Sequence, residues 1–260
     1  MKFSVFEATH QGGREINEDR MGYCYTTDSA LFLLADGMGG HPEGEMAAQV
    51  ALQAIAASFH KKAKPVLEDV PAFFEAAIMA AHRKIILYAA EKGLPDTPRT
   101  TVVAAVVQEG AATWMHCGDS RLYFVRNAEM LTRTRDHSYV EQRERGEYQS
   151  ETANTYNRNV LYTCLGSPVR PQFDISDTVV LKQGDKILLC SDGLWGSLED
   201  EDIVYQLGHF DVSQSVPTLA ERALLNAGAS SDNVTLLAME WETPNGFDTT
   251  YSGVPLTSLS

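Results

Sequence analysis

The hydrophobic pattern of the first half of the chain changes its period at residue 43. Before that point, short runs of β-branched, aromatic and aliphatic residues predict strands over 3–9, 20–27 and 30–35. From Glu43 to Lys62, apolar side chains recur every three to four residues, which predicts an amphipathic helix. A second helix is expected from Pro71 to Lys92, because proline suits a first turn and Gly93 suits the end.

Strand patterns return in the second half of the chain. They predict strands over 101–107, 112–117, 120–126, 178–182, 186–190 and 233–239. The letters QEG between the first two are short enough for a hairpin turn, so these neighbours should be antiparallel. Two more helices are expected within 199–226. Strands joined by short turns, with helices in tandem, indicate an α+β fold in which two antiparallel sheets flanked by helix pairs form a four-layer α-β-β-α sandwich.

Two segments follow neither period. Residues 137–160 are polar and charged, and we expect a mobile insertion of helix and loop there. Residues 242–260 are polar, contain proline and glycine, and should form a loosely attached tail. The rest of the pattern predicts a single domain over residues 1–241.

Composition and charge narrow the classes of function. The 260 residues are 44% hydrophobic and 22% charged, as in an ordinary globular protein. A net charge of −14 argues against a nucleic-acid-binding face, and the longest apolar runs are too short to span a membrane. The four cysteines lack paired spacing, which is typical of small buried side chains in a reducing compartment. Because MKFSVFEATHQGG also lacks a signal-peptide core, we expect a cytoplasmic protein.

Four aspartates stand at the ends of predicted strands. Asp36, Asp119 and Asp192 follow apolar runs, each beside a glycine, and Asp232 precedes a run. Because the end of one antiparallel strand lies beside the start of the next, all four can share one rim. Two unit charges about 4 Å apart cost roughly 4 kcal/mol at an effective dielectric of about 20. Such a rim is tenable if it holds cations or if some of the acids stay protonated.

The ligand types at this rim favour a hard divalent ion. Only oxygen ligands recur, without a His or Cys pair at ligand spacing, which favours Mg²⁺ or Mn²⁺ over Zn²⁺. The segment DGMGGHPEGE lacks the ligand pattern of an EF-hand and the Gly-Lys-Ser/Thr of a phosphate-binding P-loop. The alternative is that each aspartate only caps a turn, as aspartate often does.

Eight short motifs occur in an order that resembles a known enzyme family. They are GGREINEDR (12–20), ADGMGGH (35–41), RTTVVAAVV (99–107), HCGDSRLY (116–123), TRDHS (134–138), LYTCLG (161–166), LLCSDGLW (188–195) and SDNVTLL (231–237). The set resembles the metal-dependent protein phosphatases of the 2C type, and the DGMGGH form resembles bacterial members. The resemblance covers residues 1 to about 241.

This resemblance implies the sandwich fold and the hydrolysis of phosphoserine and phosphothreonine in proteins, with two or three Mg²⁺ or Mn²⁺ ions. It implies that Asp36 bridges two of the ions and that Asp192 and Asp232 complete the first. The carbonyl of Gly37 would serve the second, and Glu18 would support that ion directly or through a water. A water shared by the two ions would attack the phosphorus.

Other positions match the family in part. Asp119 resembles the ligand of a weaker third ion. Arg14 matches the arginine that binds the substrate phosphate, for which its planar fork of donors is suited, although an ordinary surface salt bridge is the alternative. Some members carry a proton-donating histidine where this chain has Met38; His41 could substitute or be structural. The usual Gly-Thr-Thr begins with Arg99 here, and LYTCLG lacks a basic residue that bacterial relatives often carry.

Three classes of function follow from these observations. The first is a monomeric serine/threonine phosphatase that counteracts a serine/threonine protein kinase in signalling. The second is a catalytically dead phosphatase-like module that binds phosphoproteins or a kinase, and the third is a metal-bound structural protein. We favour the enzyme because Asp36, Asp192 and Asp232 are all present, and because a structural protein would leave Arg14 without a purpose.

Overall fold

Strands make up most of the order of elements, and two groups of helices interrupt them. The strands are β1 (Phe3–His10), β2 (Arg20–Tyr25), β3 (Ser29–Ala35), β4 (Val102–Gln108), β5 (Ala111–Cys117), β6 (Arg121–Arg126), β7 (Glu129–Arg133), β8 (Asp174–Ile175), β9 (Val179–Val180), β10 (Lys186–Cys190) and β11 (Val234–Trp241). The α-helices are α1 (Gly44–Lys62), α2 (Val70–Lys92), α3 (Tyr139–Glu144), α4 (Asp192–Trp195), α5 (Asp200–His209) and α6 (Val212–Ala227). A 3₁₀ turn, η2, spans Gly228–Ser230.

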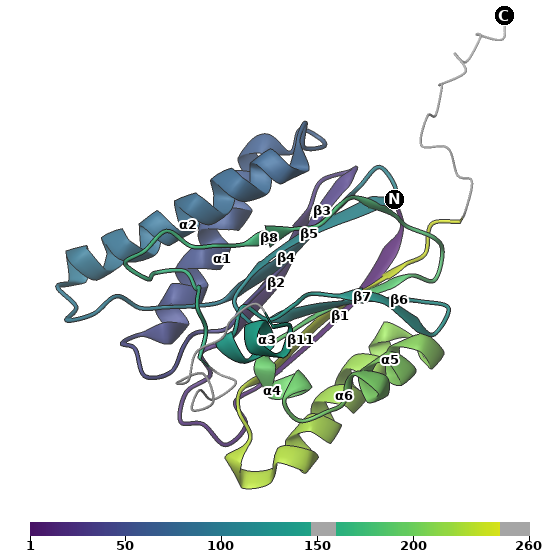
Figure 1. Ribbon diagram of the computed structural model, residues 1–260. Helices are drawn as coiled ribbons and strands as arrows, with labels where there is room; N and C mark the ends of the chain where they lie inside the picture. The colour runs from purple at the N-terminus through teal and green to yellow at the C-terminus, as the bar shows by residue number, and fades with distance from the viewer. Residues whose placement is uncertain (147–159, 245–260) are drawn as a thin grey trace, which may run out of the picture.

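Two antiparallel sheets face each other between outer layers of helix, as Figure 1 shows. This computed structural model describes residues 1–146 and 160–244. The first sheet has the strand order β1-β11-β10-β6-β7, and the second has the order β2-β3-β4-β5-β8, with β9 also paired to β5. Helices α1 and α2 cover the second sheet, and α5 and α6 cover the first. The predicted four-layer sandwich is therefore confirmed.

Alternation along the strands builds the layers. Leu33 of β3 packs into the cluster under α1 and α2, whereas its neighbour Phe32 lies between the two sheets. In the first sheet, Leu188 of β10 packs under α5 and α6, and Leu189 meets the second sheet. Because successive side chains of a strand point to opposite faces, strands covered on both faces are apolar at almost every position.

The ends of α2 follow the chemistry that its sequence indicated. The carboxylate of Asp69 accepts a hydrogen bond from the Ala72 backbone N–H at 2.8 Å, and Pro71 lies in the first turn. Gly93 ends the helix with a φ of 64°, a backbone conformation that glycine adopts without steric cost. The expected hairpin is also present: β4 and β5 are antiparallel and joined by Glu109 and Gly110, both with positive φ.

The segment KQGD carries the chain from one sheet to the other. The carboxylate of Asp185 accepts a hydrogen bond from the Lys182 backbone N–H and pairs with Arg126, both at 2.6 Å. This turn sends β10 into the first sheet, so that only Val179–Val180 of the strand expected over 178–182 forms, paired with β5 of the second sheet. The length and apolar character of residues 178–182 were therefore insufficient to predict how much of this segment forms a strand.

Three short elements carried no sequence pattern. Strand β7 is an edge strand with exposed positions, and it follows a tight turn in which Asn127 and Ala128 both have positive φ. Strand β8 has two residues and helix α4 has one turn, so neither is long enough to show a period.

Residues 147–159 and 245–260 lie outside the described part of the chain. Most of the insertion expected over 137–160 and of the tail expected over 242–260 therefore stays a prediction, as does the single domain over 1–241. The described ends of the insertion meet in a β-bridge between Ser138 and Leu161. Among the described residues, no helix combines the length and the apolar character that crossing a membrane requires.

Two leucines of different burial test the packing of the second sheet. Leu31 of β3 has no exposed surface, whereas Leu87 of α2 is 58% exposed. We expect Leu31→Ala to lower the free energy of unfolding by about 2–5 kcal/mol, because it removes buried methyl groups and leaves a cavity. The control Leu87→Ala should change it by no more than about 0.5 kcal/mol. Urea unfolding followed by circular dichroism measures both; equal effects would contradict the described packing.

Candidate active site

The ends of the two sheets border a cavity of about 550 Å³. Strands β3 and β5 are both antiparallel to β4, so both end at the same edge of the second sheet, where Asp36 and Asp119 follow them. In the first sheet, the register places the end of β10 beside the start of β11, where Asp192 and Asp232 lie. All four aspartates line the cavity, as their strand positions predicted, but they come from two facing sheets.

The structure brings together all but one of the side chains singled out from the sequence. The cavity is lined by Arg14, Glu18, Asp36, Gly37, Asp119, Asp192 and Asp232, among others. His41 is not among the lining residues; its Nε2 lies 4.0 Å from the carboxylate of Asp96. Burial, and then the charge of Arg99, lower the pKa of His41. The role of His41 as a proton donor stays a prediction.

Asp36 is held by two threonines that directly precede β4. Its backbone N–H donates a hydrogen bond to the hydroxyl of Thr101 at 3.1 Å, and its carbonyl accepts one from the Thr101 N–H at 2.9 Å. The hydroxyl of Thr100 donates to the same carbonyl at 2.8 Å. These bonds use only the main chain of Asp36, which leaves its carboxylate available to the cavity.

Arg14 reaches the cavity because two glycines pack against the chain that precedes β11. A Cβ on Gly12 would lie 2.2 Å from the carbonyl oxygen of Asp232, and one on Gly13 would lie 2.2 Å from that of Ala229. This approach places the Arg14 guanidinium 2.6 Å from the Asp232 carboxylate. The hydrogen bond and charge of Asp232 raise the pKa of Arg14, whose side chain is 55% exposed.

Asn233 joins the loop that carries Glu18 to the start of β11. Its side-chain amide donates hydrogen bonds to the carbonyls of Gln11 and Ile16, and its amide oxygen accepts one from the Glu18 N–H at 2.8 Å. The carboxylate of Glu18 lies beside Gly44, where a Cβ would approach it to 2.7 Å. Desolvation, followed by the charge of Glu45, raises the pKa of Glu18.

Asp19 is a buried acid behind the cavity that the sequence analysis did not single out. It is 4% exposed, and one carboxylate oxygen accepts a hydrogen bond from the Ser191 hydroxyl at 2.7 Å. Its other oxygen, Oδ1, is buried without a partner in the described residues. Burial first, and then the charges of Asp192 and Asp232, raise the pKa of Asp19 to about 7, although the hydrogen bond from Ser191 lowers it. The only sequence signal was its place within GGREINEDR.

The electrostatics of the cavity favour a positively charged ligand. Desolvation raises the pKa of Asp36 well above its usual range, and the neighbouring acids, Asp19 first, add to the shift. Burial does the same for Asp119, followed by the charge of Asp192. A carboxylate with a raised pKa is unfavourable as an anion, and a bound cation relieves that cost. The arrangement is thus suited to hold divalent cations through oxygen ligands.

The pKa of Asp19 predicts a pH-dependent stability in the metal-free protein. Because its pKa is raised above the value in the unfolded chain, about 3.9, the folded protein holds a proton that the unfolded chain releases. This contribution to stability is full below pH 4 and is lost as the pH rises to about 7.

We therefore expect Asp19→Asn to reduce the loss of stability that accompanies rising pH. In EDTA, between pH 5 and pH 7, the free energy of unfolding of the unmodified protein should fall by up to about 1.4 kcal/mol per pH unit more than that of the variant. Urea unfolding at a series of pH values measures this difference. Parallel curves would show that Asp19 ionises normally in the folded state.

Comparison with known proteins places the chain among phosphatases. The profile of the family described as protein phosphatase 2C matches residues 8–227. The serine/threonine phosphatase stp of Listeria innocua is 30% identical over 236 residues, which cover 87% of this chain and 91% of that protein.

Solved structures agree with the sandwich architecture. The phosphatase Stp1 from Staphylococcus aureus matches with a TM-score of 0.81 at 28% identity, over 94% of this chain and 96% of that one. The catalytic domain of the phosphatase PstP, solved in complex with two manganese ions, matches with a TM-score of 0.75 at 30% identity, over 93% and 99%. From its motifs, its fold and these similarities, the chain belongs to the protein phosphatase 2C family.

Proposed function

We propose that this protein is a metal-dependent protein phosphatase that hydrolyses phosphoserine and phosphothreonine. The observation that carries the proposal is the cavity where acids from both sheets gather around one arginine. Outside that cavity, two buried acids are paired with arginine: Asp136 with Arg121 at 2.8 Å and Asp185 with Arg126 at 2.6 Å. In the described part of the chain, no ion pair is formed by Asp36 or Asp119.

The residues of the cavity fit Mn²⁺ or Mg²⁺. Every side chain that could ligate there offers oxygen, which hard divalent ions prefer. The raised pKa values of Asp36 and Asp119 and the unpartnered Oδ1 of Asp19 are features that positive charge and ordered water would satisfy. Two or three ions are in keeping with the resemblance to the family.

Each predicted ligand has a place in this proposal. Asp36, Asp192 and Asp232 would hold one ion, and Asp36, the carbonyl of Gly37 and Glu18 would hold another. Asp119 would hold the third, weaker ion. Bound there, the ions would supply a water of lowered pKa as the nucleophile and would neutralise the phosphoryl oxygens.

Arg14 would bind the phosphate group of the substrate. The Arg14 side chain lines the cavity and is more than half exposed, and its guanidinium lies 2.6 Å from the Asp232 carboxylate. A guanidinium offers donors in a planar fork that matches two phosphate oxygens, and its charge offsets the acidic surroundings. The substrate phosphate would therefore be oriented by Arg14 while the acids hold the ions.

The proposal extends to the setting of the enzyme. We propose that it acts as a monomer in the cytoplasm against the substrates of a serine/threonine kinase, or against that kinase itself. The four cysteines are free thiols, a state that a reducing compartment maintains. The kinase is proposed by analogy with the family alone.

The metal ligands are tested by Asp36→Asn. Loss of a residue that only supports a metal ligand costs about 10- to 100-fold in activity. Removing the charged ligand itself should lower the turnover of p-nitrophenyl phosphate by more than that. EDTA should likewise stop the unmodified enzyme until Mn²⁺ is restored. Circular dichroism should show an intact fold, because the carboxylate of Asp36 accepts no hydrogen bond within the described structure.

The exposed Asp177 offers a matched control. Asp177→Asn makes the same chemical change outside the cavity and should leave turnover unaltered. Chelator-resistant hydrolysis, or normal turnover by the Asp36 variant, would refute the metal assignment. A correctly folded chain that binds Mn²⁺ without hydrolysing phosphoproteins would instead favour the phosphatase-like binding module.

Substitution of Arg14 should mainly weaken substrate binding. A hydrogen bond to a charged group contributes about 1.5–3 kcal/mol, so Arg14→Ala should raise the Michaelis constant by about 10- to 100-fold. Arg14→Lys should retain part of the affinity, because lysine keeps the charge but not the planar fork. Steady-state kinetics with a phosphopeptide measures both. Unchanged kinetics in the alanine variant would exclude Arg14 from phosphate binding.

A further inference from the structure

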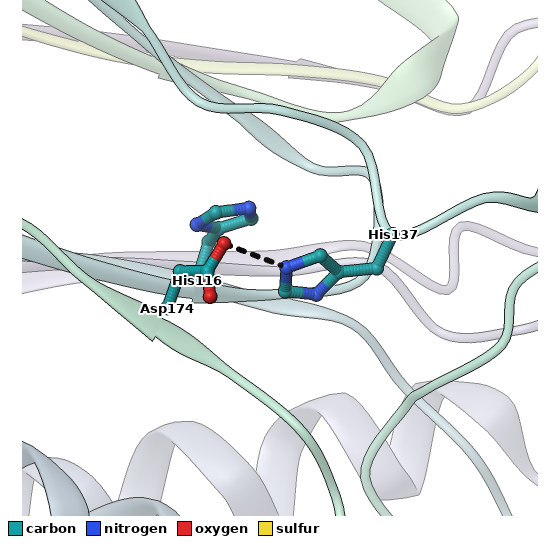
Figure 2. A group of neighbouring side chains, drawn as sticks. All are labelled: His116, His137 and Asp174. Atoms are coloured by element: carbon teal, nitrogen blue, oxygen red, sulfur yellow. Dashed lines mark hydrogen bonds and ion pairs between the residues drawn. The ribbon is translucent and has the colours of Figure 1, made fainter. Parts of the chain in front are cut away.

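Two buried histidines and an acid form a cluster outside the cavity (Figure 2). His116 belongs to β5, Asp174 stands opposite it on β8, and His137 comes from the chain that leads to α3. The two imidazole rings stack with centroids 4.3 Å apart and planes 24° apart. His137 Nε2 lies 3.3 Å from the Asp174 carboxylate, which is largely exposed.

The hydrogen bonds of this cluster disfavour a metal ion. His116 Nε2 lies 2.6 Å from the carbonyl of Arg135; because a carbonyl only accepts, this nitrogen must carry a proton. His137 Nδ1 accepts a hydrogen bond from the Gly118 N–H at 3.2 Å, so its proton is on Nε2, toward Asp174. The ligand atoms of the three residues lie within 4.8 Å of one another, but both nitrogens of His137 and the Nε2 of His116 already form hydrogen bonds within the protein.

Two hydrogen bonds with His137 hold the turn before Asp119. The His137 backbone N–H donates to the Gly118 carbonyl at 3.0 Å, while the imidazole accepts from the Gly118 N–H. Gly118 has a φ of 107°, which glycine adopts readily and other residues rarely do, and a Cβ there would lie 2.7 Å from Thr101. Because glycine restricts its own backbone little, the two hydrogen bonds to His137 are what fix this turn. The residue that follows this turn is the cavity acid Asp119, whose carbonyl is held by the Trp195 indole at 3.0 Å.

His137 also contacts the far side of the insertion. Its carbonyl accepts a hydrogen bond from the Tyr162 N–H at 3.0 Å, and the preceding residue, Leu161, lines the cavity. Burial lowers the pKa of His137, so its ring is neutral at pH 7 and Nδ1 keeps the lone pair that the Gly118 N–H requires.

We propose that His137 is a positioning residue that holds Asp119 in place for a divalent ion, with Asp174 fixing the imidazole tautomer. Asp174 accepts the proton of Nε2, which leaves Nδ1 as the acceptor toward Gly118. This inference rests on the proposed function, since it assigns Asp119 to the third and weakest ion.

Two substitutions separate the two nitrogens of the ring. In His137→Asn, the amide oxygen lies near the place of Nδ1 and can still accept from Gly118, but the reach to Asp174 is lost. In His137→Gln, the amide nitrogen lies near the place of Nε2 and can still donate to Asp174, but the acceptor for Gly118 is lost. Both variants lose the ring stack, so their general destabilisation is matched.

The measurement is the binding of Mn²⁺ to the whole chain, followed by electron paramagnetic resonance of the free ion. His137→Gln should weaken the weakest site by about 10- to 100-fold, as Asp119→Asn should, while His137→Asn should stay within about threefold of the unmodified chain. In metal-free protein, hydrogen exchange at the Gly118 amide should be about fivefold faster in the glutamine variant only.

The outcomes divide cleanly. Equal Mn²⁺ affinity in both variants and the unmodified chain, or equal losses in both variants, would overturn the positioning role. Gly118 exchange that does not distinguish glutamine from asparagine would overturn the hydrogen-bond basis without any metal. If the unmodified chain binds no Mn²⁺, the proposed function itself fails, and the assignment of Asp119 fails with it.

Discussion

Mutual repulsion among carboxylates is the constraint around which this structure is organised. Two sheets end at the same place, and each contributes a pair of aspartates to one cavity. Desolvation raises the pKa of Asp36 and of Asp119, and the neighbouring acids oppose ionisation further. When its members are ionised, such a cluster lowers the stability of the fold. The same negative charge attracts cations, so the site loses stability where it gains the ability to bind a ligand.

Uncharged groups hold Asp36, Asp19 and Glu18 without neutralising them, whereas Asp232 pairs with Arg14. Thr101 bonds the main chain of Asp36, Ser191 bonds Asp19, and Asn233 ties the Glu18 loop to the start of β11. At other positions the protein uses arginine: Arg121 contacts Asp136 through two hydrogen bonds of 2.8 Å and stacks on the Trp195 ring at 3.8 Å. The contrast separates acids that complete the fold from acids kept available for a ligand.

Long elements were predictable and short ones were not, for a physical reason. The helices α1 and α2 and the strands β3 and β4 show a sustained period because one or both faces are buried along their whole length. Strand β7, exposed at an edge, and helix α4, with one turn, have too few buried positions to show one. The strand expected over 178–182 forms only at Val179–Val180, because Asp185, paired with the distant Arg126, turns the chain toward the other sheet.

The sequence alone determined the family, the sandwich and the acids at strand ends, because alternation, periodicity and ordered motifs are local properties of the chain. Tertiary structure decided which side chains share the cavity. It brought Arg14 to Asp232, 218 positions away, and placed His41 beside Asp96, outside the lining. It also enclosed Asp19 and stacked His137 on His116. Burial and hydrogen-bond partners depend on segments that meet only after folding, so no local pattern encodes them.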